Sequence, residues 1–93
     1  MLSQLPIDLN KVSKEDADKE ILRLGMIAEL DAVTLYEQLA TKTKNNKIKN
    51  ILLDIAKEEK THIGEFETML LQLDKEQVRE NEKAKEEVEK LTR

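Results

Sequence analysis

Three ionisable side chains interrupt two otherwise apolar helical stripes, and their types suit metal binding. The apolar positions recur at steps of three and four residues: Leu22, Met26, Val33, Tyr36 and Ala40 in one segment, and Ile48, Leu52, Ile55, Phe66, Met69 and Leu73 in the next. Such spacing is typical of the buried face of a helix. The positions that continue the spacing hold Glu29, Glu59 and His62 instead. Carboxylate and imidazole groups on a buried face are candidate metal ligands.

The three residues are also expected at similar distances from the bend along the axis of a helical hairpin. The KTKNNK stretch is the only strong break before Leu73, so the two segments form an antiparallel hairpin around Asn45-Asn46. Glu29 and His62 each lie 16 residues from this bend, and Glu59 lies one turn nearer. At 1.5 Å per residue, all three stand about 20–24 Å up the hairpin. A buried carboxylate is costly unless it is paired, protonated or metal-bound, so convergence on a cation is favoured.

Each residue by itself has a plainer interpretation. A single Glu in a long helix is normally solvated, and a single His on an apolar face is more often a hydrogen-bonded core residue. Glu29 and Glu59 can also form a polar layer with His62 that fixes the register of a helical bundle. All three residues lie on the expected buried faces of two helices and at similar distances from the bend. This agreement favours a metal site over these alternatives.

The kind of metal follows from the ligands. The chain has no cysteine, which excludes disulfides, thiolate zinc sites and iron–sulfur clusters. Carboxylates with one imidazole per chain suit iron or manganese. Ferritin-like di-metal bundles take a Glu from each of two helices and a Glu-x-x-His from each of the other two. One chain carries half of that set, so a two-fold dimer would complete a four-helix bundle with two Glu29, two Glu59 and two His62.

The elements that must position these residues are all helical. We expect an extended arm over 1–12, a helical hairpin over 13–73 and a shorter charged helix over 74–93. Ser13 followed by Asp16 is a capping-box signal for the start of the first helix, which runs to about Thr43. Asn45-Asn46 suggests a left-handed residue that ends this helix.

The second helix is expected from about Lys47 to Leu73, and Asp74 with Gln77 predicts the start of the third. The third helix has a thin apolar stripe, broken by Asn81 and Lys85. It is interpreted as a contact with a neighbouring subunit or as a spacer, without a chemical role.

Size and charge narrow the function. A chain of 93 residues buries little surface when it forms long helices, so we expect a homo-oligomer. The net charge of −4 argues against nucleic acid as a partner. No apolar stretch reaches the ~20 residues of a membrane span, and the first residues lack the pattern of a signal peptide. The expected location is the cytoplasm.

The segments IAELDAVTLYEQLA (27–40) and ILLDIAKEEKTHIGEFETML (51–70) resemble the encapsulated ferritin family. The similarity is to the archaeal and thermophile type, whose ferritin-like domain can be fused to the encapsulin shell protein. It extends over nearly the whole chain from about Ile21. The pattern Glu-x6-Tyr, with Glu-x-x-His about thirty residues later, is its most specific part.

The resemblance implies that Glu29, Glu59 and His62 are ferroxidase ligands in a site between two subunits, with two iron ions at each dimer interface. It also implies that dimers assemble into a ring, expected to be a decamer. Tyr36 would lie beside the site, although an ordinary core aromatic is an equal alternative. Some relatives carry acidic residues around the first ligand as an iron entry site. Here those positions hold Ala28 and Asp31, so Asp31 alone is a candidate.

The function that the resemblance implies is oxidation of Fe(II) to Fe(III) for iron storage inside an encapsulin nanocompartment. One alternative is a rubrerythrin-like peroxidase, which usually receives electrons from a cysteine-ligated iron domain. Another is a helical assembly module without chemistry. The C-terminal sequence EEVEKLTR shows no apolar targeting tail. The chain is therefore expected either to be part of a shell fusion or to be recognised as cargo elsewhere.

Overall fold

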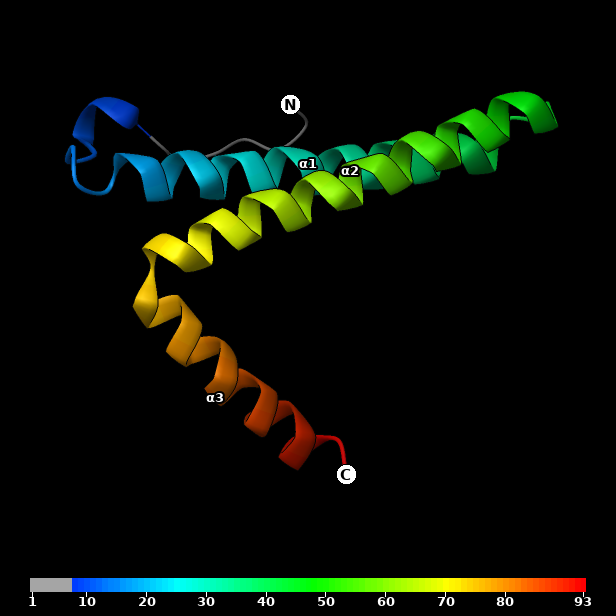
Figure 1. The fold of residues 1–93 in the computed structure, drawn as a ribbon. Coiled ribbons are helices and arrows are strands. Elements are labelled where there is room, and N and C mark those ends of the chain that lie inside the picture. The colour runs from blue at the N-terminus through cyan, green and yellow to red at the C-terminus, as the bar shows by residue number, and fades with distance from the viewer. Residues whose placement is uncertain (1–7) are drawn as a thin grey trace.

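The structure is a computed structural model that describes residues 8–93. A 3-10 turn, Leu9–Lys11, precedes three helices: α1 (Ala17–Lys42), α2 (Asn46–Leu73) and α3 (Lys75–Leu91). The helices α1 and α2 lie antiparallel, and α3 leaves the end of α2 at an angle, so the molecule is V-shaped (Figure 1). No strand occurs in the described part, which confirms the predicted all-α hairpin with a shorter C-terminal helix.

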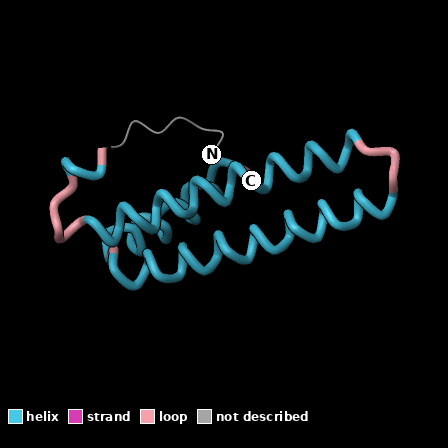
Figure 2. The backbone as a smooth tube through the Cα atoms, turned by 90° about the horizontal axis from the view of Figure 1, so that it is seen from above, coloured by secondary structure: helices cyan, strands magenta, loops and turns pink. Residues whose placement is uncertain are grey.

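The two long helices run side by side from the bend (Figure 2). Small side chains lie at several of their contacts. Among the described residues, the buried apolar side chains are Ala40, Ala56 and Leu70. A Cβ added at Gly25 would lie 2.7 Å from the ring of Phe66, so only glycine fits this crossing without rearrangement. One protomer therefore has a thin core, and most of its large apolar side chains remain partly exposed.

The bend falls where the sequence predicts it, but the predicted reason is wrong. No described residue, glycine included, has a positive φ, so Asn45-Asn46 adopts no left-handed conformation. The side chain of Asn45 instead accepts hydrogen bonds from the backbone N–H groups of Lys47 and Ile48, at 2.9 and 3.2 Å. Asn45 is thus the N-cap of α2, and it satisfies donors that would otherwise lack partners.

The first helix starts later than the Ser13 signal predicts. The Ser13 hydroxyl donates to the carboxylate of Asp16 and accepts its backbone N–H, at 3.0 and 3.3 Å. These bonds close a separate turn, and α1 begins at Ala17. Of the predicted arm, residues 1–7 lie outside the described range. The Leu9–Lys11 turn differs from an extended chain because the carbonyl of Asp8 accepts the backbone N–H of Lys11.

The junction of α2 and α3 is built around Asp74, as the sequence predicts. The backbone N–H of Gln77 donates to Oδ1 of Asp74 at 3.0 Å, which caps α3. The guanidinium of Arg23 on α1 donates to Oδ2 at 2.9 Å. Only 8% of Asp74 is exposed. A single carboxylate therefore joins all three helices.

Candidate metal centre

The hairpin brings Glu29, Glu59 and His62 together. Glu29 lies near the middle of α1, while Glu59 and His62 lie one turn apart on α2. One ligand atom from each residue falls within 4.8 Å of the others. The convergence predicted from their distance to the bend is confirmed.

The distances at this cluster suit a small cation. Nδ1 of His62 lies 3.3 Å from Oε2 of Glu59 and 3.6 Å from Oε2 of Glu29. Ligand atoms held at about 2.0–2.2 Å from one ion stand roughly 3–3.5 Å apart. The same imidazole nitrogen faces both carboxylates, so the three groups point to a common position.

The cluster opens to one side of the hairpin. The side chain of His62 is 46% exposed, whereas those of Glu29 and Glu59 are 21% and 19% exposed. By helical periodicity the same side carries partly exposed apolar side chains of both helices: Ile21, Leu39, Ile48, Ile51, Met69 and Leu73. We call this the metal side. Three ligand groups leave the coordination sphere of a metal open toward it.

Tyr36 and Asp31 lie on different faces of α1. Tyr36 follows Glu29 by seven residues, so it lies two turns along the same face, about 10 Å up the axis. Asp31 follows Glu29 by two residues, a rotation of about 200°. It is not part of the three-residue group. The roles expected for both residues remain predictions.

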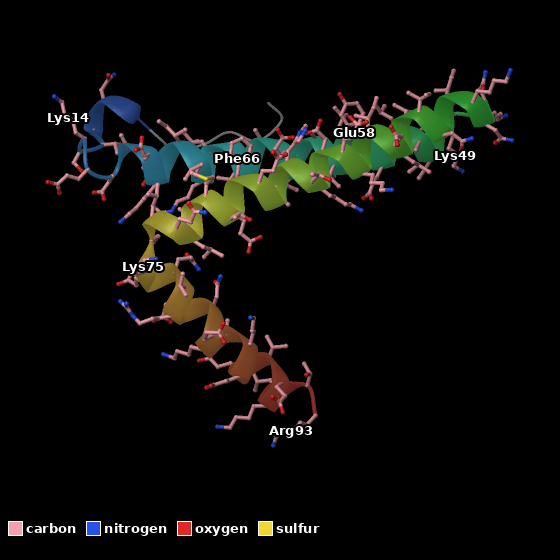
Figure 3. The ribbon with its side chains drawn as sticks, in the orientation of Figure 1. Lys14, Lys49, Glu58, Phe66, Lys75 and Arg93 are labelled. Atoms are coloured by element: carbon pink, nitrogen blue, oxygen red, sulfur yellow. The ribbon has the colours of Figure 1, made fainter. Side chains whose placement is uncertain are left out.

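Glu58 and Glu65 lie on α2 around His62, and both are exposed. Glu58 is labelled near the middle of the hairpin in Figure 3. The structure records no hydrogen bond from either side chain to His62 within the described residues. Their exposure favours a solvated state for both side chains over a contact with the cluster.

The residue that sequence reasoning missed is Arg23, which links α1 to the α2–α3 junction 51 residues away. Arg23 also pairs with Glu20 at 3.2 Å. Spacing along one helix predicts the Glu20 contact. The contact with Asp74 has no local signal, because it depends on how the hairpin closes.

The fold and the cluster define a class of protein: an all-helical, ferritin-like chain with a carboxylate–histidine cluster on its hairpin that could hold a metal ion. Residues 20–93 match the rubrerythrin family. The crystal structure of the encapsulated ferritin domain from Pyrococcus furiosus superimposes with a TM-score of 0.85 at 49% identity, over 99% of this chain and 96% of that one. The chain therefore belongs to the rubrerythrin family and, within it, to the encapsulated ferritins.

Two curated relatives are similar in sequence. The ferritin-like-encapsulin shell fusion protein of Pyrococcus furiosus is 50% identical over 99% of this chain and 27% of that protein. The encapsulin nanocompartment cargo protein EncC of Myxococcus xanthus is 38% identical over 85% of this chain and 61% of that protein. The chain thus spans about a quarter of the first relative and three fifths of the second. In the described range, no helix is long and apolar enough to cross a bilayer.

Proposed function

We propose that this chain is a ferroxidase, which oxidises Fe(II) to Fe(III) at a di-iron centre between two subunits. The observation that carries the proposal is the convergence of ligand atoms from Glu29, Glu59 and His62 within 4.8 Å. Fe(II) is the substrate, and two iron ions per dimer interface are expected. Hard oxygen ligands favour the ferric state, so the carboxylates promote oxidation.

The chain's own residues have distinct roles in this reaction. Glu29 and Glu59 would supply the carboxylates that bind the two ions. Each subunit's His62 would supply one ring nitrogen to one ion. The two Fe(II) ions lose one electron each, and dioxygen is the proposed acceptor. Two electrons and two protons reduce one dioxygen to hydrogen peroxide, so a pair of ions matches a two-electron step.

A second copy is needed because one chain provides only three ligand groups. The metal side is apolar as well as open, and an apolar surface of this kind favours association. A two-fold axis through the site would bring a second Glu29, Glu59 and His62 to the same cations. The proposed assembly is a ring of such dimers, expected to be a decamer.

The product must be stored elsewhere, because an open ring of hairpins encloses little volume. One relative is named as a fusion with an encapsulin shell and another as an encapsulin cargo protein. We therefore propose that the chain acts inside an encapsulin nanocompartment in the cytoplasm, as free cargo or as part of a fusion. Nucleic acid and membranes have no part in this function.

The proposal is tested by the rate of Fe(II) oxidation in Glu29→Ala and His62→Ala variants. Loss of a ligand should lower the rate by at least about 100-fold, since loss of an outer-shell partner alone costs about 10–100-fold. Glu80→Ala on α3 is the control and should retain the wild-type rate. Equal rates in all three variants would remove the assignment.

A second candidate is a rubrerythrin-like peroxidase, which the match to the rubrerythrin family supports. The two activities are separated by measuring hydrogen peroxide consumption and Fe(II) oxidation on the same sample. Peroxide consumption that far exceeds iron oxidation would favour the peroxidase. A non-catalytic assembly module would instead show no oxidation and no change in thermal stability or mass on adding Fe(II).

A further inference from the structure

The two long helices approach each other closely one turn away from the cluster of Glu29, Glu59 and His62. Gly25 precedes Glu29 by four residues on α1, a distance of about 6 Å along the helix. Phe66 follows His62 by four residues on α2. Because α1 and α2 are antiparallel, both residues lie on the side of the cluster that faces away from the bend (Figure 1). The crossing of Gly25 and Phe66 is therefore a packing contact directly beside the ligands.

The ring of Phe66 occupies the place where a side chain at residue 25 would begin. A Cβ built on Gly25 would lie 2.7 Å from Cε1 and 2.8 Å from Cζ of this ring. Ordinary contacts begin at 3.4 Å, so the ring or the helix would have to move by about 0.7 Å to admit one methyl group. Glycine thus fixes how closely α1 lies on α2 at this point, since the distance between packed helices depends on the side chains at their contact.

The spacing of the two helices acts on one candidate ligand more than on the other two. Glu59 and His62 share α2, so their separation is set by the backbone hydrogen bonds of that helix. Glu29 alone comes from α1, and its Oε2 lies 3.6 Å from Nδ1 of His62. A change in the distance between α1 and α2 therefore moves Glu29 relative to the other two groups.

Side-chain packing decides the helix spacing on the side of the cluster away from the bend. Toward the bend, residues 43–45 join the helices, and Ala40 and Ala56 are buried. On the other side α1 and α2 are held by packing and by the ion pair of Arg23 with Asp74, at 2.9 Å. The crossing of Gly25 and Phe66 lies between this ion pair and the cluster, where it has the most direct effect on the ligands.

The displacement caused by one methyl group is larger than a metal site tolerates. Metal–ligand distances in proteins stay within about 0.2 Å of their ordinary values. A working site holds its groups to within about 0.5 Å. A shift of about 0.7 Å between the helices exceeds both limits. A Cβ at residue 25 is therefore enough to disturb the ligand set.

We propose that Gly25 and Phe66 form a positioning pair for the metal cluster. The bare backbone of Gly25 lets the ring of Phe66 set the spacing of α1 and α2. At this spacing Glu29 reaches an ion that Glu59 and His62 bind. Neither member of the pair is a ligand, and the pair acts through Glu29. Its consequence for iron oxidation rests on the proposed function, whereas the positioning itself applies to any divalent cation with similar ligand preferences.

The first test measures the dissociation constant of the full chain for Co(II), which neighbours Fe(II) in its ligand preferences. Gly25→Ala should raise this constant by about 10–100-fold, the usual cost of losing a residue that orients a ligand. Gly64→Ala is the matched control. It adds the same methyl group two residues from His62, but a Cβ there meets nothing within 4 Å. Its dissociation constant should equal that of the wild type, and an equal increase in both variants overturns the proposal.

A double-mutant cycle connects the effect to one ligand. Adding Gly25→Ala to Glu29→Ala should cause no further loss of Co(II) affinity, because the ligand that Gly25 positions is already absent. Adding it to Glu59→Ala should still weaken binding. Equal further losses in both backgrounds would show that Gly25 acts on the hairpin as a whole, which overturns the proposal.

A general loss of stability is separated by Leu70→Val. This variant removes one methylene group from a buried side chain and adds no volume between the helices. It should be less stable than the wild type in urea and should keep the wild-type affinity for Co(II). Affinities that fall in step with the free energy of unfolding in both Leu70→Val and Gly25→Ala overturn the proposal.

A rescue variant tests the contact from the other helix. Gly25→Ala/Phe66→Leu should regain most of the Co(II) affinity, because leucine lacks the two ring atoms nearest to the added methyl group. Phe66→Trp enlarges the same contact and should weaken binding, so the test does not depend on the folding of one variant. Wild-type affinity in Phe66→Trp, or no recovery in the double variant, overturns the proposal.

The rate of Fe(II) oxidation is measured on the same samples. A wild type that binds Co(II) with this dependence on Gly25 but does not oxidise Fe(II) contradicts the proposed function and leaves the positioning role standing. A wild type that oxidises Fe(II) while Gly25→Ala binds Co(II) normally has the opposite meaning.

Discussion

At the scale of single residues, His62 is a candidate ligand that departs from the pattern around it. Its position on an apolar stripe predicts burial, yet its side chain is 46% exposed in one protomer. The exposure lies on the side from which a second copy would approach. An imidazole that lies beside two carboxylates at an open surface fits the proposed shared ligand better than it fits a core histidine.

The two glycines provide a matched pair of substitutions at this scale. Gly25→Ala should destabilise the hairpin by about 1 kcal/mol, because overpacking against Phe66 outweighs the better helix propensity of alanine. Gly64→Ala should stabilise it by about 0.5–1 kcal/mol, because a Cβ there meets nothing within 4 Å. Urea unfolding at one fixed chain concentration measures both. Destabilisation by Gly64→Ala would show that another subunit approaches this backbone.

At the scale of elements, the angle between the hairpin and α3 depends on one carboxylate. The backbone N–H of Gln77 holds the pKa of Asp74 below its ordinary value of 3.8, and the charges of Lys19 and Arg23 lower it further, against the opposing effect of burial. A depressed pKa means that Asp74 stabilises the folded state fully above about pH 3.8. This contribution is lost as the pH falls through the lower, folded-state pKa.

Part of the stability that the protein loses in acid should come from protonation of Asp74. Asp74→Asn should remove this part of the pH dependence. Asparagine keeps the ability to cap α3 but cannot pair ionically with Arg23. Free energies of unfolding are compared at pH 5 and pH 3 in wild type and variant. The wild type should lose more stability between these values than Asp74→Asn. An identical loss in both would show that other carboxylates account for the whole effect.

At the scale of the whole molecule, the hairpin has a thin apolar core. Its described residues bury few large apolar side chains, and both sides of the hairpin expose leucine, isoleucine or methionine. The proposed association would contribute much of the stability that a larger core provides in other domains. The proposed metal site would add to it, because its ligands would come from two chains.

Metal should consequently stabilise the assembled form. A ligand that binds only the folded dimer, at a free concentration 100 times its dissociation constant, adds about 2.7 kcal/mol to the free energy of unfolding. Native mass measurement should show the dimer or ring increasing on addition of Fe(II) and decreasing after chelation. His62→Ala should abolish this dependence. A single species of unchanged mass under all these conditions would contradict the coupling between metal and assembly.

The sequence by itself determined the helices, the bend, the cap at Asp74 and the height at which Glu29, Glu59 and His62 meet. These features follow from periodicity and from distances along the chain, which are local quantities. The tertiary structure decided that Asn45 caps α2 without a left-handed residue and that Arg23 reaches Asp74. Those outcomes depend on how two helices rotate against each other and where a third one leaves them, and spacing along a single helix carries no information about either.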